Sequence, residues 1–303
     1  MSAPIISIVG QTASGKTALS ISLAKKLGAE IVNLDAYQLY KKMDIGTAKP
    51  SLEEREGIKH HLIDVVDISH EGNVSEFQQW ARTVILSLNE RDIPVICVGG
   101  SGLYVKAVLD DLKFPGTDPV IREKYETLLE TLGNEKLHEI LAEKDPVAAS
   151  HIIAGNSRRV VRALEVIELT GEPFMAQLPQ QAPVINAIRI GLNLERELLL
   201  QRIAQRTKTM FAQGWPTEVA ELEVQGLFET ATASRALGYK EVSQFNRGEL
   251  TEVAAMDLIA TATNKFSRRQ MQWFGRDDLI NWFEALDPQL ESKVYDFISA
   301  ANH

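Results

Sequence analysis

The stretch Gly10-Gln11-Thr12-Ala13-Ser14-Gly15-Lys16-Thr17 decides the fold, because it has the pattern G-x-x-x-x-G-K-[ST] of loops that cradle phosphate groups. The apolar, β-branched run Ile5 to Val9 precedes it and predicts a buried parallel strand. Behind it, leucines recur at every fourth position up to Gly28, which predicts a helix over Thr17 to Leu27. A strand, a glycine loop and a helix N-terminus in this order form an anion site.

The loop supplies three kinds of phosphate contact. Backbone N–H groups and the helix dipole face the phosphates, Lys16 adds a positive charge, and the Thr17 hydroxyl can ligate Mg²⁺. The predicted phosphate-binding residues are Gly10, Thr12, Ala13, Ser14, Gly15, Lys16 and Thr17, of which Thr17 is also the predicted metal ligand. Any di- or triphosphate suits such a loop, so the motif alone leaves the ligand open.

Composition limits the class of protein. With 303 residues, 45% of them hydrophobic, the chain can bury the core of one large or two modest domains. We expect neither a signal peptide nor a membrane span, since no charged start with an apolar core and no sufficiently long apolar run occurs. The lone cysteine, Cys97, precludes an internal disulfide and is expected to be a buried hydrophobe, which favours a reducing, cytoplasmic location.

Strand and helix patterns alternate through the first third of the chain. Further strands are expected at Glu30 to Leu34, at His61 to Val66, and at Ile93 to Val98 before Gly99-Gly100-Ser101-Gly102, with a helix at Val74 to Leu88. The alternation predicts an α/β fold with a doubly wound, mostly parallel sheet, in which ligands bind beyond the carboxyl ends of the strands.

The pattern changes near Pro115. Asp118-Pro119 opens a helical region, the polar stretch Gln177 to Pro183 follows it, and a strand at Ala187 to Leu192 can complete the sheet. From Glu195 onward we expect helices, one of them amphipathic over Glu252 to Trp273. We therefore predict a phosphate-loop core at 1–114, an inserted helical module at 115–186, and a return to the core sheet with C-terminal helices at 187–303.

Basic residues gather in three places although the net charge is −9. One group follows Ser157, a second is diluted by glutamates between Arg196 and Lys208, and a third lies between Leu258 and Arg276. A single group of this kind usually forms a solvated helix face. Three of them in an acidic protein suggest a groove for a polyanion.

The carboxylate most suited to chemistry is Asp35, which ends the strand expected beside the phosphate loop. There it can hold Mg²⁺ through water or act as a general base. As an isolated aspartate it could also cap the next turn. Asp64 is the nearest candidate for a second acidic residue of ATPase type, and a loop or cap role is equally open to it.

The segment Asp35 to Tyr40, followed by Met43 to Pro50, resembles the signature of the tRNA dimethylallyltransferase family. The resemblance extends along nearly the whole chain, through blocks that begin at His60, Gly99, Arg158, Ala236 and Arg268. It implies transfer of a dimethylallyl group from dimethylallyl diphosphate to N6 of the adenosine next to the anticodon, at tRNA position 37, without consumption of ATP. The products are N6-isopentenyladenosine and diphosphate. The implied cofactor is Mg²⁺. The implied partner is the anticodon stem-loop of tRNA, contacted by the helical module at 115–186, with no membrane and no obligate protein partner.

The resemblance also implies roles for particular residues. Asp35 takes the proton of N6, and Ser101, where the family usually has threonine, lies near the reacting centre with Thr17. Arg235 reaches the diphosphate or the RNA. The implied tRNA-binding residues are Asp35, Ala36, Tyr37, Gln38, Ser101, Arg122, Arg158, Arg159, Arg162, Lys265, Arg268 and Arg269. Asn264 and Gly275 stand where the family commonly has arginine, which removes two positive charges from the C-terminal RNA contact.

Two other functions remain open at this point. A related adenylate isopentenyltransferase would act on a free nucleotide and would need neither three basic groups nor a large insert. An ATP-dependent kinase or a nucleotide-binding switch would use the same loop, but a kinase needs a phosphoryl acceptor site and a switch needs nucleotide-responsive contacts. Incubation with labelled dimethylallyl diphosphate and either tRNA, AMP or ATP separates these functions.

Overall fold

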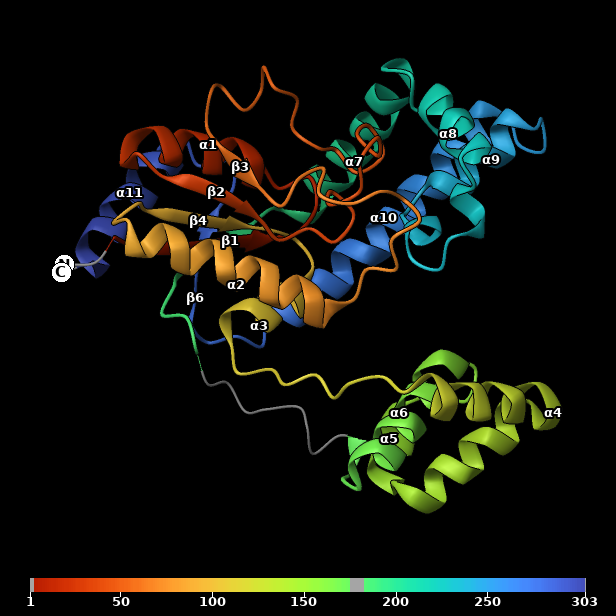
Figure 1. The fold of residues 1–303 in the computed structure, drawn as a ribbon. Coiled ribbons are helices and arrows are strands. Elements are labelled where there is room, and N and C mark those ends of the chain that lie inside the picture. Colours follow the sequence, from red (N-terminus) through yellow and green to blue (C-terminus); the bar gives the residue numbers. More distant parts are fainter. Residues whose placement is uncertain (1–2, 175–182, 303) are drawn as a thin grey trace. The chain divides into compact units, whose positions relative to one another are not determined.

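The computed structural model describes residues 3–174 and 183–302. Contacts divide the chain into two compact units (Figure 1). One unit combines Met1–Leu109 with Ile185–His303, and the other is Asp110–Val184. The polar stretch that we singled out at 177–183 lies almost entirely outside the described residues.

The larger unit is built on a parallel sheet of six strands in its described part, in the order β3-β2-β4-β1-β5-β6. Its strands are β1 (Ile5–Gly10), β2 (Glu30–Asn33), β3 (His60–His61), β4 (Val95–Val98), β5 (Ile188–Asn193) and β6 (Ile280–Glu284). The inner strands are apolar on both faces, as expected for a sheet covered on both sides. The carboxyl ends of β1, β2 and β4 therefore meet at one edge, where ligands bind in such folds.

Helices cover both faces of this sheet (Figure 1). On one face α1 (Lys16–Leu27) and α11 (Leu290–Ala301) share a core with the strands. On the other face α2 (Val74–Glu90) and α3 (Gly102–Leu109) pack around Phe77 and Val108. Burial of the apolar stripe of each helix against the sheet gives the three-layer arrangement.

The C-terminal helices of the same unit form a second core next to the sheet. They are α7 (Arg196–Ala212), α8 (Trp215–Val224), α9 (Tyr239–Asn246) and α10 (Glu252–Phe274), with short 3-10 turns at Leu227–Glu229 and Ala233–Arg235. Trp215 and Tyr239 are buried there together with Tyr40 and Met43 from the segment after β2. This shared core fixes the segment after β2 against the helices.

The smaller unit is helical and has its own core. It contains α4 (Pro119–Lys144), α5 (Pro146–His151) and α6 (Ser157–Thr170). Asp118 caps α4 by accepting the N–H groups of Val120 and Ile121, and Gly133 kinks that helix with a φ of 79°. The helix start predicted at Asp118-Pro119 is thus confirmed.

Two predicted elements were wrong. The strand expected over His61 to Val66 is only His60–His61, because Leu62 and Asp64 adopt positive φ angles of 59° and 57° that end the extended chain. The expectation of helices alone after Glu195 missed β6, an edge strand beside β5. Most of its side chains are exposed, so its sequence lacks the apolar run that marks a buried strand.

Within the described residues, we find no helix that combines the length and apolar character needed to span a membrane.

Candidate active site

The phosphate loop lies between β1 and α1 and is shaped by two glycines. Gly10 has a φ of 140°, and a Cβ atom there would lie 2.7 Å from the Leu192 carbonyl oxygen, so the loop passes close to β5. Gly15 has a φ of 96° and precedes the first turn of α1. This backbone turns the N-terminus of α1 toward the loop, as an anion site requires.

Lys16 is held inside the loop. Its Nζ donates to the carbonyl oxygens of Gly10 at 3.1 Å and Gln11 at 2.6 Å. Burial and the charge of Arg206 lower the pKa of Lys16 to about 7. Among the described residues, Ser14 contributes a buried hydroxyl that has no hydrogen-bond partner. A buried cation and an unpaired hydroxyl in one loop fit an anionic ligand.

Arg206, on α7, also reaches this loop, and sequence reasoning missed it as a site residue. Its Nη1 donates to Thr12 Oγ1 at 3.3 Å, and burial lowers its pKa. In the sequence, Arg206 is marked only as one member of the basic group between Arg196 and Lys208. The contact with Thr12 joins residues 194 positions apart, so the folded chain was needed to find it.

Asp35 follows β2 and shares the electrostatic environment of Lys16 and Arg206. Its Oδ1 accepts the N–H of Tyr37 at 2.9 Å, so the turn-forming role that we considered is present. Burial raises the pKa of Asp35, against the lowering effects of the Tyr37 N–H and the Lys16 charge. The site therefore places one carboxylate of raised basicity beside two cations.

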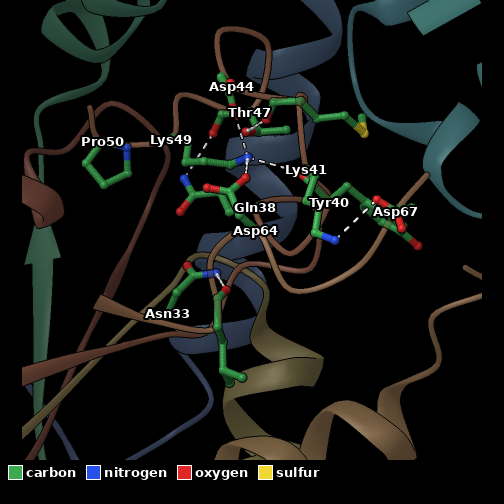
Figure 2. Close-up of polar contacts among 12 residues, drawn as sticks. Asn33, Gln38, Tyr40, Lys41, Asp44, Thr47, Lys49, Pro50, Asp64 and Asp67 are labelled. Atoms are coloured by element: carbon green, nitrogen blue, oxygen red, sulfur yellow. Dashed lines mark hydrogen bonds and ion pairs between the residues drawn. The ribbon is translucent and has the colours of Figure 1, made fainter. Parts of the chain in front are cut away.

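The segment from residue 38 to residue 50 is held by its own polar side chains (Figure 2). Gln38 Nε2 donates to the carbonyl oxygens of Thr47 and Ala48. Lys49, whose side chain is 3% exposed, donates to the Tyr40 carbonyl and pairs with Asp44 and Asp64 at 2.6 Å each. Asp64 thus contributes to the order of this segment.

Glu218, on α8, ties the same segment to the helical core. Its carboxylate accepts the N–H groups of Asp44, Ile45 and Gly46 at 2.9, 2.6 and 3.1 Å. It also accepts the Tyr239 hydroxyl at 2.8 Å. Nothing in the sequence singles out Glu218, because a lone glutamate on a predicted helix belongs to no motif.

A pocket of about 320 Å³ opens at the two residues that directly follow Asp35. It is lined by Ala36, Tyr37, Gly100, Ser101, Gly102, Leu103, Tyr104, Thr232, Phe266, Arg269, Gln270 and Trp273. Ser101 and Arg269, predicted from distant blocks of sequence, thus share one cavity with Ala36 and Tyr37. Its aromatic walls and few polar groups suit a planar or apolar ligand.

Arg235 and Thr17 are exposed. Arg235 ends a 3-10 turn and lies near Tyr37, because its charge acts to lower the pKa of the Tyr37 hydroxyl, which burial raises. Thr17 stands in the first turn of α1. Among the described residues, no group of three histidine, cysteine or carboxylate side chains could hold a metal ion.

The basic residues of α10 are exposed. Lys265 and Arg268 face solvent, whereas the exposed Arg269 also stacks over Phe266 with its guanidinium 5.8 Å from the ring centre. Asn264 accepts a hydrogen bond from Arg196 of α7 at 3.2 Å. An arginine from the neighbouring helix thus lies at a position where the resemblance had indicated a missing charge.

The basic residues of the helical unit are of two kinds. Arg158 and Arg159 are exposed at the start of α6. Arg122 and Arg162 instead pair with the fully buried Glu165 at 2.8 and 3.0 Å. Arg162, which the resemblance implied as a tRNA contact, is therefore held in an ion pair within this unit.

The chain has close relatives among known proteins. Residues 38–277 match the family model described as IPP transferase. A tRNA dimethylallyltransferase of Streptomyces griseus is 50% identical over 282 residues, which cover 93% of this chain and 90% of that protein. A tRNA dimethylallyltransferase of a Nocardioides strain is 45% identical over 298 residues, with coverage of 98% and 96%.

Solved structures agree in fold. The crystal structure of a tRNA isopentenylpyrophosphate transferase from Bacillus halodurans has a TM-score of 0.73 and 36% identity, covering 98% of this chain and 96% of that chain. A eukaryotic dimethylallyltransferase, studied in crystallographic snapshots of its action on tRNA, has a TM-score of 0.85 and 26% identity, with coverage of 99% and 80%. The predicted α/β fold with a mostly parallel sheet is confirmed by these structures and by the observed strand order.

Proposed function

The chain belongs to the IPP transferase family, and on that premise we propose that it transfers a dimethylallyl group from dimethylallyl diphosphate to N6 of the adenosine at tRNA position 37. The observation that carries this proposal is the convergence of Lys16, Asp35 and Arg206 beside the aromatic pocket. A diphosphate needs the cations, and a weakly nucleophilic amine needs the carboxylate. The arrangement of these three residues supports the proposal because it supplies both the cations and the carboxylate.

The diphosphate is the leaving group in this reaction. The loop amides, Lys16 and the unpaired Ser14 hydroxyl would bind its oxygens, and Arg206 joins them through its position on Thr12. The bond between C1 of the dimethylallyl group and the diphosphate oxygen breaks, and its electron pair leaves with the diphosphate. Fixed positive groups at the oxygens stabilise that developing charge.

Asp35 is proposed as the proton acceptor. As the bond from N6 to C1 forms, N6 becomes positively charged, and its proton passes to the Asp35 carboxylate. The raised pKa of Asp35 makes it a better base than an exposed aspartate. Ser101 and Tyr37 line the adjoining pocket, where the extruded adenine would lie.

We propose Mg²⁺ as the cofactor. The donor set fits an ion held mainly by substrate oxygens and water, because Mg²⁺ commonly binds through phosphates with few protein ligands. Thr17 supplies a hydroxyl at the start of α1, within the phosphate loop. When bound, the ion would neutralise charge on the diphosphate.

The tRNA partner would be held by exposed arginines and lysines. Lys265, Arg268 and Arg269 on α10 and Arg158 and Arg159 on α6 present such charges. Phosphate contacts of this kind position RNA, whereas the flipped base is recognised in the pocket.

We propose that the reaction takes place in the cytoplasm, which suits a lone buried cysteine whose pKa burial raises to about 12.

Labelled dimethylallyl diphosphate tests the proposal. The protein is incubated with it and either tRNA, AMP or ATP, and the RNA is digested to nucleosides. We expect label in N6-isopentenyladenosine from tRNA alone, with no stimulation by ATP. Label transferred to AMP would favour the adenylate transferase, and a requirement for ATP hydrolysis would favour an ATP-driven enzyme.

A further inference from the structure

Gln270 occupies an unusual place for a residue of the helix that carries the basic surface. Its side chain is buried, with 4% of its surface exposed. Its Oε1 accepts the N–H of Thr12 at 2.8 Å, and its Nε2 donates to the carbonyl oxygen of Gly100 at 2.9 Å. One amide group thus spans the phosphate loop and the loop after β4.

The two loops that Gln270 contacts lie beyond the point where β1 and β4 are paired as strands. β1 and β4 pair in register only as far as Ile8 and Val98. Beyond that point the chain turns into the phosphate loop on one side and into Gly99–Gly102 on the other. Beyond the end of the strand pairing, the Gln270 amide links the two loops through its hydrogen bonds to Thr12 and Gly100.

The glycines of the second loop show how closely α10 approaches. A Cβ atom on Gly100 would lie 2.3 Å from Gln270 Nε2, and one on Gly102 would lie 2.0 Å from the Trp273 ring. A larger residue at either position would require the Gln270 or Trp273 side chain to move. Ser101, between these glycines, is therefore placed by α10.

The Thr12 N–H is equally constrained. In a phosphate loop this group would otherwise be free to turn toward the ligand, but here Gln270 fixes its direction. The Thr12 hydroxyl in turn accepts from Arg206. Thr12 is thus held from two sides, at its N–H by Gln270 and at its hydroxyl by Arg206.

We propose that Gln270 is a positioning residue that sets the distance between the leaving diphosphate, on the phosphate loop, and the acceptor adenine, beside Ser101. This inference rests on the proposed transfer reaction. Misplacement of reacting groups by about 1 Å can slow a reaction by about a hundredfold without loss of binding. Gln270 therefore acts on turnover through geometry.

The test compares Gln270→Met and Gln270→Glu with the same changes at Gln272, which is exposed on the same helix. Methionine removes both hydrogen bonds, whereas glutamate keeps the acceptor for Thr12 and removes the donor to Gly100. We expect kcat to fall about tenfold or more for both Gln270 variants, with the Kd of inorganic diphosphate and the KM of tRNA changed less than about threefold. The Gln272 variants should match the wild type.

Amide hydrogen exchange gives a readout that does not depend on activity. Residues 10–17 and 99–102 should exchange faster in Gln270→Met than in Gln272→Met. Unchanged exchange, normal kcat, or a loss confined to diphosphate affinity would each overturn the inference. If Gln270→Met fails to fold, Gln270→Glu decides the question. A wild-type protein that transfers no label contradicts the proposed function, whereas an active wild type matched by both variants contradicts only the role of Gln270.

Discussion

The phosphate loop and the start of α6 are both rich in positive charge, yet they use it in opposite ways. Lys16 in the loop and Arg206 on α7 lie near a single carboxylate, Asp35, and burial lowers the pKa of both cations. In the helical unit, Arg122 and Arg162 pair with Glu165, a carboxylate with no exposed surface. Lys16 and Arg206 donate to uncharged protein oxygens, which leaves their charge for a ligand, whereas Arg122 and Arg162 pair directly with a buried carboxylate and have a structural role.

The largest expected effect concerns Asp35, the carboxylate that follows β2 beside the phosphate loop. Asp35→Asn keeps the size of the side chain but removes the proton acceptor, so kcat should fall by about a hundredfold or more. Binding of tRNA should change little. Turnover and tRNA affinity, measured on the same preparation, check this, and near-normal turnover would contradict the assignment of Asp35 as base.

The next effect tests the cation that sequence reasoning missed. Arg206→Ala removes a charged hydrogen-bond donor, so the Kd for diphosphate should rise about tenfold to a hundredfold. Arg202→Ala is the matched control, because Arg202 is exposed one turn earlier on α7. Calorimetric titration with inorganic diphosphate separates the two variants. Equal affinities would remove Arg206 from the site.

A smaller effect follows from the lowered pKa of Lys16. In the free protein Lys16 loses its proton near pH 7, but a bound diphosphate stabilises the charged form and raises this pKa. Affinity for diphosphate should therefore fall as the pH rises above about 7, by at most about tenfold per pH unit.

Lys16→Arg is the control for this pH dependence, since arginine keeps its proton. Titration of the diphosphate itself affects both proteins equally, so the difference between their pH profiles isolates Lys16. Identical profiles for the two proteins would show that Lys16 stays charged in the free site.

The contrast between these regions also explains what could be predicted from sequence. Local patterns were sufficient for β1, the phosphate loop and α1, and for the cap at Asp118, because each depends on neighbours in the chain. Arg206 and Glu218 could not be assigned, since their partners lie 194 and about 170 residues away. Charge counting could not separate such residues from solvated ones.

The sequence did not predict strand β6, for a different reason. An edge strand buries little surface, so Trp282 and Phe283 had no periodic pattern around them. Its pairing with β5 determines its conformation. That pairing places Ile280 opposite Arg189, although several helices separate the two residues in the sequence. Tertiary contact, in this case, outweighs local sequence preference.

The smallest effects concern α6, where the two kinds of arginine can be compared directly. Arg162 donates to Glu165 and to the carbonyl oxygens of Pro115 and Gly116 at 2.6 and 3.0 Å. Burial acts to raise the pKa of Glu165, but the hydrogen bonds from Arg122 and Arg162 outweigh it and lower that pKa. Arg162→Ala should therefore lower the free energy of unfolding by about 1–3 kcal/mol.

Arg159 is exposed on the same helix, and its replacement should affect tRNA binding more than stability. Arg159→Ala should change the free energy of unfolding by no more than about 0.5 kcal/mol, because the side chain lies at the surface. If Arg159 contacts a tRNA phosphate, the slope of log K against log salt should become shallower by about 0.7. Urea unfolding and tRNA titrations at several salt concentrations measure both quantities for both variants. An unchanged slope for Arg159→Ala would remove this residue from the RNA interface, and equal stabilities would show that the Glu165 cluster contributes little to the helical unit.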